Sequence, residues 1–229
     1  IYANFFRAAL EMDLPLSFHI LTGEQSGYRG SALNGFMQTI RGCQDILGML
    51  VYGGVFDRHP DLKVVCVEAD AGWVPHYMYR MDHAYLRHRH WITPGQELRQ
   101  KPSAYFADNI YVTFQDDWSA FGAAKAGLIN VERLLWANDF PHSDSTWPWS
   151  QALLAQHSQG LEPTVLDKIL HQNVAGLYGI DLSRIEQDKA ILDPSDEVGF
   201  NDTPLDFKHA GSLADSPSST PPPSFIAME

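Results

Sequence analysis

The chain has 229 residues, of which 45% are hydrophobic, so it can bury one sizeable core or part of a larger one. Its formal net charge of -12 and its isoelectric point near 5.1 disfavour nucleic acid and anionic membrane surfaces as partners. No run approaches the roughly 18 apolar residues that a membrane span needs, and the two cysteines, Cys43 and Cys66, provide no disulfide framework, which indicates a reducing, cytoplasmic setting.

Short apolar runs alternate with helical patterns along the chain, which is typical of βα units arranged around parallel strands. The first run, Leu16 to Ile20, predicts a strand, and apolar residues then recur at helical spacing from Phe36 to Leu50. A second run, Leu62 to Val67, predicts the next strand. The later patterns predict a helix over 73–91, strands over 110–114 and 134–137, and helices over 150–157 and 163–178, the last ended by Gly179.

The two ends of the chain differ from the rest. From Ile185 to Glu229 the chain holds six of the fourteen prolines and nine acidic residues against two lysines. Such a segment cannot bury enough apolar surface to fold alone, so we predict a folded region over 1–184 and a largely disordered tail over 185–229. The chain begins with Ile1 rather than Met, inside a helical pattern, and we therefore expect that it is a fragment whose amino-terminal part is missing.

Polar residues close three of the predicted strands. His19 ends the first, Glu68 follows the second, and Asp139 follows the fourth, with His142 three residues further on. The carboxyl ends of parallel strands are where catalytic groups and metal ligands gather. Imidazole and carboxylate ligands at this edge suit Zn²⁺, or Mn²⁺ with more oxygen ligands.

A plainer interpretation stays open for two of these residues. Asp139 could simply cap a turn, and His19 could be a hydrogen-bonded core histidine. Glu68 is harder to explain structurally, because a carboxylate directly after an apolar strand is costly to bury without a cation or a donor.

Seven segments, in the correct order, resemble the amidohydrolase-related family. They are similar to the branch that contains aminocarboxymuconate-semialdehyde decarboxylase. The segments are Leu14 to Ile20, His59 to Val65, Glu68 to Pro75, Arg80 to Asp82, Lys101 to Phe106, Leu135 to His142 and Lys168 to Gly179. The resemblance implies an α/β fold, a distorted TIM (β/α)8 barrel with a divalent metal at its carboxyl face, of which this chain holds about strands five to eight.

The resemblance also implies roles for individual residues. In this family a His-x-His pair on strand one, a His on strand five and an Asp on strand eight hold the metal. By motif position His19 corresponds to the strand-five ligand and Asp139 to the strand-eight ligand, which can also relay a proton. The chain departs from the pattern twice: no His-x-His pair precedes His19, and Glu68 stands where the best-studied decarboxylases carry a His.

Three functions follow as expectations. The order of the motifs favours a carboxy-lyase that removes CO₂ from a small cyclic or aromatic carboxylic acid, with Asp139, Glu68 and His142 as catalytic residues. Glu68 could instead serve a metal-dependent hydrolase of a lactone, an amide or a C–C bond. The third alternative is an inactive half barrel, because four βα units leave two sheet edges open. The expected partners are a small-molecule substrate and, by resemblance alone, further copies of the chain in a homo-oligomer.

Overall fold

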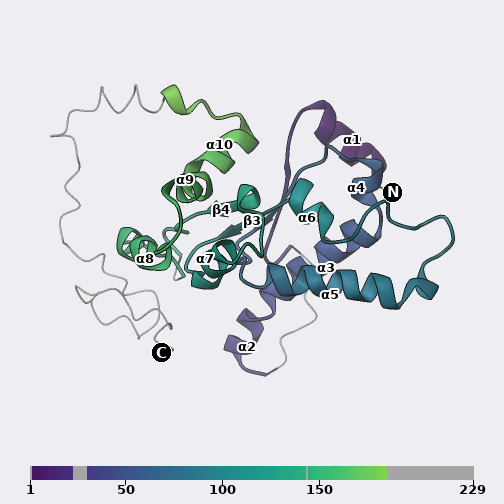
Figure 1. Cartoon of the computed structure of the whole chain (residues 1–229), viewed down its shortest axis with the longest axis horizontal. Coiled ribbons are helices and arrows are strands. Elements are labelled where there is room, and N and C mark those ends of the chain that lie inside the picture. The colour runs from purple at the N-terminus through teal and green to yellow at the C-terminus, as the bar shows by residue number, and fades with distance from the viewer. Residues whose placement is uncertain (1, 23–29, 143, 185–229) are drawn as a thin grey trace.

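The computed structural model describes residues 2–22, 30–142 and 144–184 (Figure 1). The predicted tail over 185–229 lies outside the described residues. Within them, four strands form one parallel sheet whose spatial order follows the chain: β1 (Leu16–His19), β2 (Val64–Val67), β3 (Ile110–Phe114) and β4 (Leu134–Trp136). The prediction of βα units around parallel strands is confirmed, and each predicted strand is present with its ends shifted by at most two residues.

Helices and helical turns connect the strands. They are α1 (Ala3–Glu11), α2 (Ala32–Phe36), α3 (Thr39–Tyr52), α4 (Val55–Arg58), α5 (Val74–Arg87), η1 (Arg89–Trp91), α6 (Ala104–Asp108), α7 (Trp118–Lys125), η2 (Val131–Arg133), α8 (Ser150–His157), α9 (Pro163–Asp167), η3 (Lys168–Gln172) and α10 (Asn173–Tyr178). No helix in the described part of the chain is long and apolar enough to cross a membrane.

Two predicted helices are divided in the structure. The helix expected over 73–91 ends at Arg87, and a 3₁₀ turn follows after His88. The helix expected over 163–178 runs through the π-helical turn η3, and Gly179 ends it in the left-handed conformation, at a φ of 65°. A residue without a Cβ takes this conformation at little cost, which is why glycine is the usual stop signal.

The strands β2 to β4 are buried on both faces of the sheet, whereas Ser17 and His19 of β1 are exposed. On one face, alternate strand residues such as Cys66, Val112 and Phe114 join the main core with the connecting helices. On the other face, which we call the α10 face, Val65, Tyr111 and Leu135 pack against apolar residues of α10. In Figure 1, α9 and α10 lie above β3 and β4, whereas α7 lies below them. Burial on both sides explains why β2, β3 and β4 are mostly continuous apolar runs rather than alternating ones.

The register aligns the carboxyl ends of the strands at one edge. His19 pairs with Val67, and Phe114 pairs with Trp136. The loops that leave β1, β2, β3 and β4 therefore start side by side, which is the position in open α/β and barrel folds where functional sites are built.

Candidate metal centre

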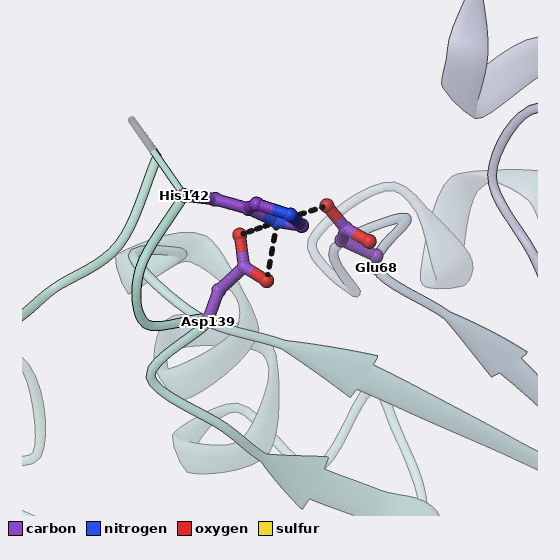
Figure 2. A group of neighbouring side chains, drawn as sticks. All are labelled: Glu68, Asp139 and His142. Carbon is purple, nitrogen blue, oxygen red and sulfur yellow. Dashed lines mark hydrogen bonds and ion pairs between the residues drawn. The ribbon is translucent and has the colours of Figure 1, made fainter. Parts of the chain in front are cut away.

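Three side chains from two of these loops converge at the carboxyl edge. Glu68 directly follows β2, Asp139 lies three residues after β4, and His142 occupies the next turn. One ligand atom from each of them lies within 4.8 Å of the others. Figure 2 shows the ring of His142 reaching between the two carboxylates. Residues 71 positions apart in the sequence are thus brought together, as the strand-end pattern leads one to expect.

The distances within this group fit shared coordination of a cation or a shared proton. His142 Nδ1 lies 3.0 Å from Asp139 Oδ1, 3.1 Å from Asp139 Oδ2 and 3.7 Å from Glu68 Oε1. The side chains of Glu68 and Asp139 are only 15% and 16% exposed, whereas that of His142 is 63% exposed. The carboxylates therefore form the floor of the site, and the imidazole lies at its solvent-facing side.

His19 approaches the group from β1 through Glu68. Its Nε2 contacts Glu68 Oε2, and its Nδ1 lies 2.7 Å from the carbonyl oxygen of Ile20. A carbonyl oxygen can only accept, so in a neutral imidazole the proton sits on Nδ1 and the Nε2 lone pair faces the carboxylate. Two acceptors that face each other need a positive charge between them. Glu68, Asp139 and His142, two carboxylates and one imidazole, form the group whose ligand atoms lie close enough together to hold a divalent cation, and His19 contacts this group through Glu68.

The backbone at both carboxylates adopts an unusual conformation. Glu68 has a φ of 65° and Asp139 a φ of 59°. Asp tolerates this left-handed region, but a Glu there costs of order 1 kcal/mol and persists only where the surroundings hold it. The turn around Asp139 is fastened by Asn138, whose carbonyl oxygen accepts from Thr146 N at 3.0 Å and from Ser145 Oγ at 2.6 Å.

Further acidic groups lie beside the site. Burial raises the pKa of Asp70 to about 7, and the nearby carboxylates of Asp117 and Asp144 add to that rise. Burial also raises the pKa of Asp116. Asp117 has a structural task, because its side chain caps α7 and accepts hydrogen bonds from the backbone of Ala71 and Gly72.

Sequence reasoning did not single out the polar residues around β3. Gln115 donates from its side-chain amide to both Asp139 and Asp144. The signal was present, because Gln115 directly follows the third predicted strand. A neutral amide is not a typical metal ligand or proton-transfer group, and the two residues that Gln115 contacts are distant from it in the sequence.

Comparison with known proteins supports the architecture. A family model described as "Amidohydrolase" matches residues 2–180. An amidohydrolase from Mycobacterium avium subsp. paratuberculosis K-10 is similar, with a TM-score of 0.61 and 20% identity over 77% of this chain and 45% of that one. A 2,6-dihydroxybenzoate decarboxylase from Rhizobium has a TM-score of 0.62 and 18% identity over 79% of this chain and 55% of that one.

A third structure carries a metal. The dihydroxybenzoic acid decarboxylase of Polaromonas sp. JS666, solved with manganese and the inhibitor 2-nitroresorcinol, has a TM-score of 0.57 and 19% identity over 78% of this chain and 54% of that one. The chain thus spans about half the length of the solved structures that it matches. At these identities the likeness establishes a shared fold.

Proposed function

The chain belongs to the amidohydrolase family, and from that premise we propose that residues 1–184 are about strands five to eight of a TIM barrel with metal-dependent carboxy-lyase activity. The substrate class is a small aromatic or cyclic carboxylic acid. The single observation that carries the proposal is the convergence of Glu68, Asp139 and His142 at the carboxyl edge of the sheet. Structural neighbours that are decarboxylases support this reaction over others of the family.

His19, Glu68, Asp139 and His142 are the residues of this chain that would hold the metal. Zn²⁺ suits the imidazoles, and Mn²⁺ suits the carboxylates. When bound, a divalent ion supplies a positive charge that stabilises the carboxylate and oxygen groups of the substrate as electrons shift. The manganese in the Polaromonas decarboxylase favours Mn²⁺ as a second candidate beside Zn²⁺.

Proton placement falls to Asp139 and His142. Loss of CO₂ breaks a C–C bond, whose electron pair stays on the substrate carbon and must receive one proton. Asp139 orients the imidazole through Nδ1, which leaves the exposed far side of the His142 ring to deliver that proton. Glu68 is mostly buried, contacts His19, and places its carboxylate 3.7 Å from His142 Nδ1, so it holds both imidazoles at the site.

Aromatic side chains beside the site favour a flat substrate. Phe140 follows Asp139 directly and is 50% exposed, and its ring meets that of Trp147 edge-to-face at 5.0 Å. Edge and face contacts with such rings stabilise aromatic ligands. Trp73 serves packing instead, because its indole N–H donates to the carbonyl of Ala69 and its ring packs on Tyr77.

Hydrolysis of a lactone, an amide or a C–C bond is the second candidate. The observation that favours it is Glu68, a carboxylate aimed into the group where it could accept a proton from attacking water. The inactive half barrel is the third, since β1 and β4 each have a partner strand on one side only within the described residues.

One experiment separates these functions. The full chain, loaded with Zn²⁺ or Mn²⁺, is incubated with a panel of aromatic acids and lactones, and the products are identified. We expect release of CO₂ with an equal amount of the decarboxylated ring, and at least a 100-fold loss in Asp139→Asn. A ring-opened acid would instead support the hydrolase. If the metal-loaded protein converts no compound of the panel, the result would argue against both the carboxy-lyase and the hydrolase and in favour of the inactive half barrel.

A further inference from the structure

The strand β3 supplies none of the four candidate ligands, although it lies between the two strands that carry the carboxylates. Thr113 alternates with Tyr111 along β3 and so shares the α10 face with it, and Gln115 directly follows the strand. We propose that these two side chains position the metal centre, with Thr113 holding Glu68 and Gln115 holding Asp139. This inference rests on the proposed function and adds two positioning residues to it.

Thr113 acts on the backbone of Glu68. The hydroxyl oxygen of Thr113 accepts a hydrogen bond from the Glu68 N–H at 2.7 Å. At that residue the chain leaves β2 and enters the left-handed region, at a φ of 65°. The bond joins the backbone rather than the carboxylate, so it sets the direction in which the Glu68 side chain leaves the loop. It also supplies the outside support that a left-handed Glu requires.

Gln115 acts on the carboxylate of Asp139. Its amide nitrogen lies 3.4 Å from Asp139 Oδ2 and 3.3 Å from Asp144 Oδ2. The residue is buried, with 8% exposure, and its backbone carbonyl oxygen accepts from Trp136 Nε1 at 3.0 Å, which ties it to β4. An amide orients a carboxylate without neutralising it. A neutral amide therefore does not compete with a cation for Asp139, whereas the positive charge of an Arg at this place would.

The same strand thus reaches both of its neighbours. Thr113 bonds towards the loop after β2, and Gln115 bonds towards the loop after β4. Because one contact starts within the centrally paired strand β3 and the other at the residue that directly follows it, the distance between the two carboxylates is set by β3 and its carboxyl end rather than by the other two loops themselves. Residues that orient ligands in this way commonly change metal affinity by about 10- to 100-fold when they are removed.

The test compares four variants of the full chain. Thr113→Val keeps the β-branched shape but removes the acceptor, and Thr113→Ser restores it. Gln115→Met keeps the length of the side chain without the amide. Tyr111→Phe is the matched control, because it removes a hydroxyl from the same face of the same strand. Affinities for Zn²⁺ and Mn²⁺ are measured by competition with a chelator, thermal unfolding is followed, and hydrogen exchange of the Glu68 amide is measured by NMR without metal.

We expect Thr113→Val and Gln115→Met to lower metal affinity by about 10-fold or more, with Thr113→Ser and Tyr111→Phe close to wild type. Exchange of the Glu68 amide should be faster in Thr113→Val alone. If the wild-type chain binds neither ion, the proposed function fails, and the exchange rate then decides this inference by itself. The inference would be overturned if the Glu68 amide of Thr113→Val exchanges at the wild-type rate. It would also be overturned if the wild-type chain binds metal and both Thr113→Val and Gln115→Met bind it with wild-type affinity.

Discussion

At the scale of single residues, Glu68 combines two features that each lower the stability of the folded state. Its φ of 65° is unfavourable for a side chain with a Cβ, and its carboxylate faces that of Asp139 through His142. Residues retained in such conformations are concentrated at functional sites, where the strain serves the geometry of the site. Stability and function should therefore respond in opposite directions to a change at this position.

The substitution Glu68→Gly tests that opposition. Glycine adopts a positive φ freely, and the change also removes one of two neighbouring negative charges, so the free energy of unfolding should rise by about 1 kcal/mol. Metal affinity should fall at the same time, since a ligand is lost. Urea denaturation in the presence of a chelator measures the first effect, and a metal titration measures the second. A variant that is both less stable and equally good at binding metal would contradict this account.

At the scale of elements, the loop between β2 and α5 packs tightly against the start of α7. A Cβ added to Gly72 would lie 1.7 Å from Ser119 Oγ and 2.8 Å from Ser119 Cβ. Ser119 cannot easily move away from such a Cβ, because the side chain of Asp117 holds it at the start of α7. The close approach also lets the Gly72 N–H reach that same carboxylate, at 2.6 Å.

We predict that Gly72→Ala destabilises the fold by about 1–3 kcal/mol, the usual cost of overpacking. Gly122→Ala is the matched control within α7, because a Cβ there meets nothing within 4 Å, and it should be neutral or stabilising. The free energy of unfolding by urea measures both. In the pair Gly72→Ala with Ser119→Gly, the loss should be smaller than the sum of the single losses, and strict additivity would show that the contact is not the cause.

The helix α8 carries a buried histidine that should make the fold sensitive to acid. The His157 side chain is 3% exposed, and its Nε2 has no hydrogen-bond partner within the described residues. Burial lowers the pKa of His157 below its usual value, and the positive charge of Lys125 adds to this, whereas Asp116 and Asp117 oppose it.

The sign of the pH dependence follows from that direction. Below about pH 6.5 the unfolded chain binds a proton at His157 that the folded chain does not yet take up, so stability falls as the pH drops through this range. Above about pH 6.5 His157 is neutral in both states and no longer lowers the free energy of unfolding. We expect His157→Phe to flatten the decline between pH 7.5 and pH 5, measured by urea unfolding at several pH values. His171→Gln, at an exposed position of η3, serves as the control, and an unchanged decline in His157→Phe would refute the assignment.

At the scale of the whole molecule, the candidate metal centre connects segments that are far apart in the chain. It joins the ends of β1 and β2 to the loop after β4. The chain spans about half the length of the solved structures that it matches, and one cation held by these three segments would stabilise the sheet as a unit. A ligand that binds only the folded state raises its stability by mass action.

Addition of Zn²⁺ or Mn²⁺ should therefore raise the thermal unfolding temperature of the full chain, and a chelator should reverse the rise. Asp139→Asn keeps the shape and the left-handed conformation but should lose most of the shift. Asp13→Asn is the matched control, because Asp13 also has a positive φ, 51°, and lies exposed at the end of α1. An equal metal-induced shift in Asp139→Asn and in wild type would remove Asp139 from the site.

Much of the architecture could be predicted from local patterns. The apolar runs that end at His19, precede Glu68 and precede Asp139 are strands in the structure, and the stop at Gly179 is in place. These features depend on neighbouring residues alone, through burial, propensity and backbone freedom. The break of the predicted helix after Arg87 was missed because its apolar and aromatic residues continue through Trp91.

By itself the sequence determined the parallel βα arrangement, the polar strand ends and, through its motifs, the resemblance to the amidohydrolase family. Only the tertiary structure decided that Glu68, Asp139 and His142 meet, that His19 joins through Glu68, and that Thr113 and Gln115 reach the two carboxylates. The physical reason is that strand order and register are set by packing between segments that lie tens of residues apart. A side-chain contact across strands exists only once that register is formed.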